Sequence, residues 1–381
     1  MNREIIFWFD QPPKVGKGCF NYISQTWDGL VIFAYLHDFN KTRKSVNWND
    51  NEYGKACLIE LSPDTQNKVD DLFTQYPKAI HVADGFKSEM MRYLKKYILS
   101  KEYKFISFSE RPGIYGKWWK RMLKKIYIPL SEIYIAKKYG DKVYAYLPLG
   151  QTGVKTALKY GWSKEKLYPF MYDPVDYVTD HTVYPVEEKI RLLYVGRFSK
   201  YTKGTDTLIK AIDLLESDSN KYILDMAGGY GDLRDKTLKW IETKQNVNFL
   251  GLWDSKKVGM NMKKYDICIV PSKFDGWNLL VNEAVRAHIA VIATDEAVSD
   301  ELVTESKAGL VVKANSPKSL AKAIDYAINN RNEINRWKHN AKNYADCISS
   351  KAVGTYMMNI ILHECLDIGD ERPHCPWIEE S

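Results

Sequence analysis

A short loop that leads into a helical pattern carries the clearest chemical signal in this 381-residue chain. The loop 271–278 follows an apolar run at 267–270, and the helical pattern begins at about Leu279. The first N–H groups of a helix have no partners inside the helix, so such a loop can bind an anion like a phosphate. Gly276 and Asn278 are residue types that tolerate a positive φ, which predicts a tightly wrapped loop.

Two carboxylates bracket the start of this helix. Asp275 lies in the loop, and Glu283 lies one turn into the helical pattern. A carboxylate accepts hydrogen bonds from hydroxyl groups, including those of a ribose or another sugar. Glu283 has a simpler alternative explanation, because a negative charge near a helix start stabilises the helix by about 0.3–1 kcal/mol. Beside an anion-binding loop, the pair favours a ligand that carries both phosphate and sugar.

A second loop places cations at the end of another apolar run. The loop 196–204 follows the run 192–195 and contains Arg197 and Lys203. A guanidinium can bind a phosphate through two N–H groups, and a lysine adds a point charge. These cations suit a diphosphate, although a solvated basic loop would have the same composition. A third loop, the glycine-rich segment 227–232, is a weak signal by itself.

The loops follow apolar runs that alternate with helical patterns through both halves of the chain. Continuous apolar runs are typical of parallel strands covered by helices on both faces, and ligands of such sheets bind beyond the carboxyl ends of the strands. The polar segment 173–188 separates the two halves. The chain is therefore expected to be an α/β protein with two doubly wound domains. The predicted strands are 5–9, 30–36, 56–61, 79–82, 105–108 and 143–147, then 192–195, 222–226, 247–250, 267–270, 291–293 and 310–312.

Length and composition fit two globular domains. A content of 45% hydrophobic and 27% charged residues excludes a disordered or fibrous chain. Six scattered cysteines and the lack of a secretory pattern at the start favour a reduced cytoplasmic compartment. The spacing of His363, Cys365, His374 and Cys375 fits no usual zinc pattern, so no metal site is expected. No apolar stretch reaches the roughly 20 residues of a transmembrane helix.

The three loops, in this order and spacing, resemble the C-terminal donor-binding domain of retaining glycosyltransferases of family 4, which have the GT-B fold. The resemblance implies two Rossmann-like domains with a cleft between them. Residues 1–173 would bind the acceptor, residues 187–354 would bind the nucleotide sugar, and a helix at about 355–381 would pack back on the first domain. The residues that carry the resemblance are Gly196-Arg197, Lys203-Gly204, Gly228-Gly229, Pro271-Ser272, Asp275-Gly276-Trp277-Asn278, Glu283-Ala284 and Val291-Ile292-Ala293-Thr294.

The resemblance also implies roles for individual residues. Arg197 and Lys203 would contact the donor diphosphate, Glu283 would hold the ribose, and Asp275 would stand beside the transferred sugar as a catalytic residue. Asp275 replaces the family's glutamate and Asn278 replaces a glycine. This Asp-Gly-Trp form is similar to that of a subgroup common among bacterial surface-polysaccharide enzymes. The full set of donor-binding candidates is Arg197, Lys203, Gly276, Trp277, Asn278, Leu279, Glu283, Gly228 and Gly16.

The first half matches the family less closely. The segment Lys14-Val15-Gly16-Lys17-Gly18 stands where the family has a glycine-rich loop near the donor phosphates and the acceptor. Gly16 is accordingly a donor-binding candidate, and Lys17 is an acceptor-side candidate.

Strand ends supply the remaining candidates of the first half. Glu110 and Arg111 follow the predicted strand 105–108 and are expected at the cleft as catalytic residues. His81, near the end of the predicted strand 79–82, is a weaker acceptor-side candidate, since a lone histidine at a strand end more often packs or hydrogen-bonds.

Positive charge is concentrated in the first half of the chain. Residues 1–186 contain 28 Lys/Arg against 20 Asp/Glu, whereas the remainder contains 27 against 28. The excess is concentrated in Arg111–Lys138, and within it the segment Lys117–Ile128 interleaves cations with Trp118, Trp119 and other apolar side chains. A basic amphipathic helix with tryptophan favours contact with an anionic membrane surface. A core helix with a solvated basic face is the alternative, and no recognised nucleic-acid module accompanies the patch.

The resemblance implies a retaining glycosyltransferase that transfers a sugar from a nucleoside-diphosphate sugar to a glycan or lipid-linked acceptor. The setting would be the synthesis of a surface polysaccharide (capsule, O-antigen or lipopolysaccharide) at the inner face of the cell membrane. No metal or cofactor is expected, because fixed cations can stabilise the departing diphosphate. Another GT-B activity, such as a sugar-nucleotide epimerase, and a non-catalytic module that binds sugar nucleotides or membranes are the alternatives.

Overall fold

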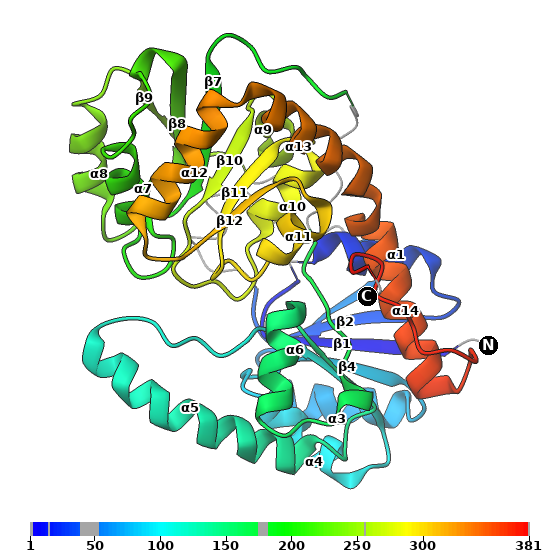
Figure 1. The fold of residues 1–381 in the computed structure, drawn as a ribbon. Helices are drawn as coiled ribbons and strands as arrows, with labels where there is room; N and C mark the ends of the chain where they lie inside the picture. Colours follow the sequence, from blue (N-terminus) through cyan, green and yellow to red (C-terminus); the bar gives the residue numbers. More distant parts are fainter. Residues whose placement is uncertain (1–2, 14–15, 39–52, 174–181, 255–256, 380–381) are drawn as a thin grey trace. The chain divides into compact units, whose positions relative to one another are not determined.

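The computed structural model describes residues 3–13, 16–38, 53–173, 182–254 and 257–379. The chain forms two compact units, each coloured by sequence in Figure 1. The first comprises Met1–Ile114, Trp118–Val175 and Ser350–Pro376, and the second comprises Tyr115–Lys117, Asp176–Ser349 and Trp377–Ser381.

The first unit is built on a six-stranded parallel sheet with the order β3-β2-β1-β4-β5-β6. All five residues of the central strand β1 are buried, because helices cover both faces of the sheet. The strands are β1 (Ile5–Phe9), β2 (Val31–Tyr35), β3 (Cys57–Glu60), β4 (Ile80–Asp84), β5 (Lys104–Ser109) and β6 (Ala145–Pro148). The helices are α1 (Lys17–Thr26), α3 (Thr65–Gln75), α4 (Met91–Ser100), α5 (Trp118–Tyr139), α6 (Gly150–Lys159) and α14 (Ser350–Leu366).

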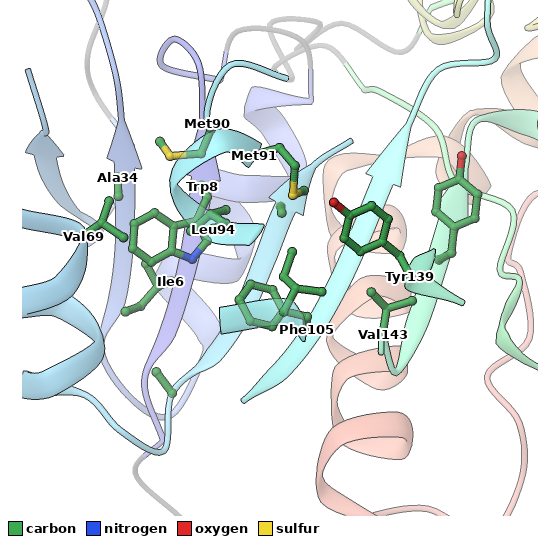
Figure 2. Packing of buried hydrophobic residues seen from close by; sticks show 14 of the residues in the cluster. Ile6, Trp8, Ala34, Val69, Met90, Met91, Leu94, Phe105, Tyr139 and Val143 are labelled. Atoms are coloured by element: carbon green, nitrogen blue, oxygen red, sulfur yellow. The ribbon is translucent and has the colours of Figure 1, made fainter. Parts of the chain in front are cut away.

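Large aromatic side chains fill the core of the first unit. Figure 2 shows Trp8 of β1 among Ile6, Val69 and Leu94. The Trp8 ring also stacks on Phe73, with 5.5 Å between the ring centroids. Helix α14, from the far end of the sequence, packs against α1 and so belongs to this unit.

The second unit repeats the architecture with the order β12-β11-β10-β7-β8-β9. Its strands are β7 (Ile190–Gly196), β8 (Tyr222–Gly228), β9 (Val247–Gly251), β10 (Ile267–Val270), β11 (Ala290–Thr294) and β12 (Gly309–Val312). Its helices are α7 (Thr205–Ile212), α8 (Arg234–Ile241), α9 (Val258–Met262), α10 (Leu279–Arg286), α11 (Asp300–Ser306), α12 (Pro317–Asn329) and α13 (Arg331–Tyr344).

Both sheets have the strand order of the dinucleotide-binding Rossmann fold. The third strand pairs with the second, the second with the first, and the first with the fourth. The direction of winding reverses beside β1 and β4 in the first unit and beside β7 and β10 in the second. Loops at such a switch point diverge and leave a crevice for ligands beyond the strand ends. The predicted fold class, two doubly wound α/β domains, is confirmed.

Two further findings concern membranes and metals. Across the described residues, no helix has both the length and the run of apolar side chains that crossing a bilayer requires. In the same part of the chain, no group of three His, Cys, Asp or Glu side chains could hold a metal ion.

A buried ion pair ties helix α13 to the sheet of the second unit. Lys338 Nζ lies 3.0 Å from Asp266 Oδ1, and both side chains are almost completely buried. The other carboxylate oxygen of Asp266 accepts a hydrogen bond from the Arg191 backbone N–H at 2.9 Å. Removing one charge of such a pair leaves the other buried without a partner.

Replacing Lys338 by Met is therefore expected to lower the free energy of unfolding of the second unit by about 3–5 kcal/mol. Urea denaturation measures the change. The matched control is Lys342→Met, an exposed lysine on the same helix, which should leave the transition nearly unchanged. Similar midpoints for both variants would contradict the importance of the pair.

Candidate functional site

The two loops at the switch point of the second unit touch through their backbones. A Cβ atom at Gly204 would lie 1.9 Å from the Pro271 carbonyl oxygen, and Gly204 has a φ of +65°. The backbone N–H of Lys273 donates to the Thr202 carbonyl at 2.6 Å. Only glycine allows this approach without displacing one of the loops. The loop after β7 is thus fixed against the loop after β10.

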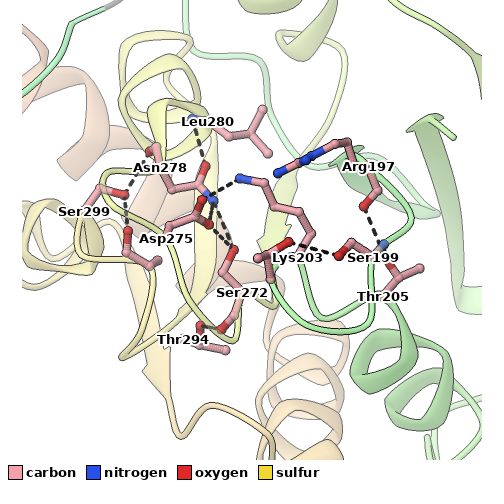
Figure 3. A network of polar contacts seen from close by, with 12 residues as sticks. Arg197, Ser199, Lys203, Thr205, Ser272, Asp275, Asn278, Leu280, Thr294 and Ser299 are labelled. Carbon is pink, nitrogen blue, oxygen red and sulfur yellow. Dashed lines mark hydrogen bonds and ion pairs between the residues drawn. The ribbon is translucent and has the colours of Figure 1, made fainter. Parts of the chain in front are cut away.

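The Asp275 carboxylate is the centre of a polar network that joins the two loops (Figure 3). Lys203 Nζ lies 2.7 Å from Asp275 Oδ1. The other carboxylate oxygen accepts hydrogen bonds from Ser272 Oγ and from Asn278 Nδ2, the latter at 2.9 Å. The lysine and aspartate side chains keep 23% and 13% of their surface exposed. The network therefore lies at the surface of the unit, within reach of a ligand.

Asn278 caps the helix that follows the loop. Its Oδ1 accepts a hydrogen bond from the Leu280 N–H at 3.1 Å, and its own carbonyl accepts one from Ser299 Oγ at 2.9 Å. Neither residue of this loop that tolerates a positive φ uses one. Asn278 has a φ of −92°, and Gly276 does not adopt a positive φ. The asparagine is needed here because its side chain both caps α10 and braces Asp275.

Trp277 faces away from the surface. Its side chain is buried, and its indole N–H donates to Asn282 Oδ1 at 2.8 Å. The indole therefore fixes the loop onto α10. Any contact of Trp277 with a ligand would be made by its backbone.

Arg197 lies at the exposed end of the first loop. Its carbonyl accepts a hydrogen bond from the Tyr194 hydroxyl at 2.8 Å, which holds the backbone in place. Among the described residues its guanidinium forms no ion pair with a carboxylate, so it can bind an incoming anion.

Glu283 lies on α10, and burial raises its pKa to about 8. Its charge also contributes to the raised pKa of the buried Cys268 thiol on β10. No hydrogen bond or ion pair engages the Glu283 side chain within the described part of the chain. A carboxyl held in this way has capacity for a ligand hydroxyl.

Gly228 has a structural explanation. A Cβ atom there would lie 2.1 Å from the Gly196 carbonyl oxygen, and its φ is +111°. The glycine lets the ends of β7 and β8 pair closely, which places the loop of Arg197.

The start of helix α1, which follows the glycine-rich segment of the first unit, already binds a carboxylate of the protein itself. Gly16 precedes α1, and the N–H of Cys19 donates to the Asp173 carboxylate at 3.0 Å. A phosphate at this helix start would have to displace Asp173. Lys17 is buried, and its ammonium lies 4.8 Å from the centre of the Tyr53 ring. Lys14 and Val15, the other members of the predicted loop, lie outside the described residues.

His81 lies in the core, so its expected position at a strand end was wrong. It is the second residue of β4 and has no exposed surface. Its Nδ1 accepts a hydrogen bond from the Trp8 indole at 3.1 Å, and burial lowers its pKa to about 3. The residue at the carboxyl end of β4 is Asp84, which the sequence analysis missed.

Glu110 and Arg111 directly follow β5, as predicted. Glu110 lines a cavity of the first unit together with Asp84.

The predicted strand 79–82 ended two residues too early, because an Asp-Gly pair is typical of a turn. The same pair is also the signal that could have identified Asp84, because an aspartate directly before a turn glycine such as Gly85 can stand at the end of a strand.

The basic helix has a long exposed section, and Figure 1 shows α5 reaching out from the first unit. No side chain from Trp118 to Tyr127 is buried, and Trp118 has 78% of its surface exposed. Burial begins at Ile128, where the helix meets the core. The exposed large apolar residues of the helix are Trp118, Trp119, Met122, Leu123, Ile126, Tyr127, Leu130, Ile133 and Tyr134.

Comparison with known families and curated proteins identifies relatives of this chain. Residues 180–344 match the family described as "Glycosyl transferases group 1". A protein in the cps region of Klebsiella pneumoniae is 28% identical over 54% of this chain and 62% of its own length. An uncharacterized glycosyltransferase of Methanocaldococcus jannaschii is 31% identical over 42% of this chain and 41% of its own length. The match thus spans less than two thirds of these relatives.

Solved structures resemble the chain over almost its whole length. The HepE protein of Anabaena, determined in complex with UDP, has a TM-score of 0.69 at 13% identity, with 94% of this chain and 99% of that chain covered. WaaG, a glycosyltransferase involved in lipopolysaccharide biosynthesis, has a TM-score of 0.54 at 16% identity, again with 94% and 99% covered. These likenesses show that the chain has the GT-B fold, with two Rossmann-like domains.

The raised pKa of Glu283 predicts a pH-dependent stability. The ordinary pKa of 4.5 applies in the unfolded chain, whereas the folded protein keeps the proton up to about pH 8. Because folding favours the protonated form, stability falls as the pH rises from about 4.5 to about 8. The glutamine of the Glu283→Gln variant cannot ionise. The free energy of unfolding of this variant should therefore rise relative to that of the wild type as the pH increases over this interval. Thermal midpoints of both proteins across the interval measure the effect, and parallel profiles would refute the buried carboxyl.

Proposed function

We propose that this chain is a glycosyltransferase that transfers a sugar, with retention of configuration, from a nucleoside-diphosphate sugar to a glycan or lipid-linked acceptor. The acceptor would belong to a surface polysaccharide such as capsule, O-antigen or lipopolysaccharide. The observation that carries the proposal is the Lys203–Asp275–Asn278 network at the start of α10. The family match over residues 180–344 and the relatives named above support it.

The second unit would bind the donor through its diphosphate. Lys203 and Arg197 supply positive charge from the loop after β7, and the backbone N–H groups at the start of α10 that Asn278 does not engage would add hydrogen bonds. Negative charge grows on the diphosphate as the sugar departs, so fixed cations stabilise the transition state more than the ground state. Such an arrangement can act without a metal ion or another cofactor.

Asp275 would have two tasks in this scheme. Its carboxylate holds the Lys203 ammonium, whose position would otherwise vary because of its flexible side chain. Three protein donors occupy part of its hydrogen-bonding capacity, and about four lone-pair sites are present on a carboxylate. The remaining capacity can accept a hydroxyl of the transferred sugar. Asp275 is accordingly a catalytic residue beside the reacting sugar.

The other candidates complete the proposed site. Glu283 would accept hydrogen bonds from the donor ribose, since no protein group in the described chain uses its carboxyl. Glu110 and Arg111, which directly follow β5 of the first unit, would contact the acceptor.

A sugar-nucleotide epimerase is the alternative among enzymes, and a non-catalytic binding module is the alternative among other classes. Epimerisation needs no acceptor, whereas transfer requires one. A binding module would hold a nucleotide sugar without releasing the nucleotide.

We also propose that α5 attaches the protein to the inner face of the cell membrane. Its first half exposes aromatic and aliphatic side chains together with Lys120, Arg121 and Lys125, and the exposed Lys117 directly precedes the helix. Each such cation near an anionic surface contributes about 1 kcal/mol. An acceptor carried by a membrane lipid would then lie near the enzyme.

Donor turnover tests the proposed site. Nucleotide release should be followed with UDP- and GDP-sugars, with and without lipid-linked acceptor extracted from membranes. Lys203→Ala is expected to reduce acceptor-dependent release by about 10²-fold or more, because a preorganised charge is lost from the transition state. Lys210→Ala, an exposed lysine on α7, is the control and should retain activity. Absence of release from every donor would overturn the transferase proposal, and full activity of Lys203→Ala would overturn the site.

Vesicle binding tests the role of α5. The double variant Trp118→Ser/Leu123→Ser should bind vesicles that contain phosphatidylglycerol about tenfold or more weakly than the wild type, because two large apolar side chains no longer insert. Leu214→Ser, at an exposed leucine of the second unit, serves as the control. Sedimentation with vesicles measures the affinity. Equal binding by the double variant and the wild type would exclude α5 as the attachment surface.

A further inference from the structure

The first unit contains a cavity of about 320 Å³ at the carboxyl ends of β4, β5 and β6. This volume is at the low end of the range for small-molecule sites, which suits a ligand the size of one sugar ring. The second half of α5 forms one wall. Glu132 and Ile135 of this helix line the cavity.

Asp84 presents to this cavity a carboxyl that the protein does not use. It is the last residue of β4, and Gly85 follows with a φ of +68°, which turns the chain away. Among the described residues, the Asp84 side chain forms no hydrogen bond or ion pair, while its backbone pairs with β5 in the sheet. The neighbouring Asp10 differs, because its carboxylate accepts hydrogen bonds from the N–H groups of Glu89 and Met90 at 3.0 and 2.8 Å.

The cavity is electronegative. Among the described residues, Asp84, Glu110 and Glu132 line it with one cation, Lys87. Lys87 Nζ pairs with the Glu132 carboxylate and also donates to Ser131 Oγ at 2.9 Å, so its charge is already compensated. Burial, followed by the charges of Asp10 and Glu110, raises the pKa of Asp84 to about 7. A further negative charge brought into the cavity would meet the same repulsion.

The remaining walls suit the rest of a sugar ring. Phe86, Tyr146 and Tyr172 supply aromatic surface, against which apolar C–H groups can pack. The hydroxyls of Ser109 and Tyr146 lie 2.7 Å apart and form a hydrogen-bonded pair at the cavity wall. Hydroxyl and carboxyl groups beside aromatic rings are the combination that fixes the orientation of a small polar ligand in a pocket.

We propose that this cavity binds one sugar ring of the acceptor, that Asp84 and Glu110 bind its hydroxyl or amino groups, and that sugars bearing a carboxylate or phosphate are excluded. The inference rests on the proposed function, since it assigns the acceptor to the first unit, and it adds the chemical class of the acceptor residue. Asp84 is a specificity-determining residue in this arrangement.

Saturation-transfer NMR on the full chain tests the proposal with three soluble ligands: methyl glucoside, methyl 2-amino-2-deoxyglucoside and methyl glucuronide. The neutral and amino glycosides are expected to bind at least about tenfold more tightly than the glucuronide, which corresponds to 1.4 kcal/mol of charge repulsion. Asp84→Asn and Glu132→Gln should each reduce this ratio about fivefold or more, the first by removing a carboxylate and the second by freeing the Lys87 charge. Asp71→Asn, at an exposed aspartate of α3, should leave it unchanged.

Several results would overturn the inference. The first is glucuronide binding as tight as that of the glucoside. The second is an unchanged ratio of glycoside to glucuronide affinity in both Asp84→Asn and Glu132→Gln. The third is a protein that binds UDP but none of the glycosides. Glu132→Gln decides the matter if Asp84→Asn does not fold. UDP binding, measured by calorimetry on the same sample, separates the two proposals: glycoside binding without binding of any nucleotide would contradict the donor site and leave the cavity assignment supported.

Discussion

The site of the second unit depends on the contact between Gly204 and the Pro271 carbonyl. Any side chain at residue 204 would force the two loops apart, since even a Cβ atom would come within 1.9 Å of that oxygen. With the loops in contact, Lys203 reaches Asp275 at 2.7 Å, and Asn278 can cap α10 while bracing the same carboxylate. One backbone contact thereby positions a cation, a carboxylate and a helix start in a single place.

The two units share a strand order, but the side chains of the proposed sites at their strand ends differ. In the second unit, Arg197 and Lys203 follow β7, which suits an anionic diphosphate. In the first unit, Asp84 and Glu110 end β4 and follow β5, and the start of α1 is already bound to the Asp173 carboxylate. The proposed sites would therefore differ in their chemistry, with one for a charged donor and one for a neutral or cationic sugar.

The sequence predicted the elements well and the contacts between distant residues poorly. Buried parallel strands are continuous apolar runs, so β1 and β10 were located at the correct residues and each other predicted strand lies within two residues at both ends. Asp84 was missed because an Asp-Gly pair suggests a turn. His81 was predicted at the carboxyl end of its strand, but β4 ends three residues later, at Asp84. The Asp173 carboxylate accepts a hydrogen bond from the Cys19 N–H, and 154 residues separate the two in the sequence. A local sequence pattern cannot predict a contact between residues so far apart. Local chemistry favours phosphate binding by Arg197 and Lys203, which stays a prediction, whereas only the fold shows that Asp275 holds the lysine.

The most direct measurement is a crystal structure of the chain with bound nucleoside diphosphate. If the two loops of the second unit form the donor site, the terminal phosphate will lie about 2.7–3.2 Å from Lys203 Nζ and from the backbone N–H groups at the start of α10. Arg197 should approach the same phosphate. A diphosphate bound elsewhere, for example at the start of α1 in place of Asp173, would contradict this assignment.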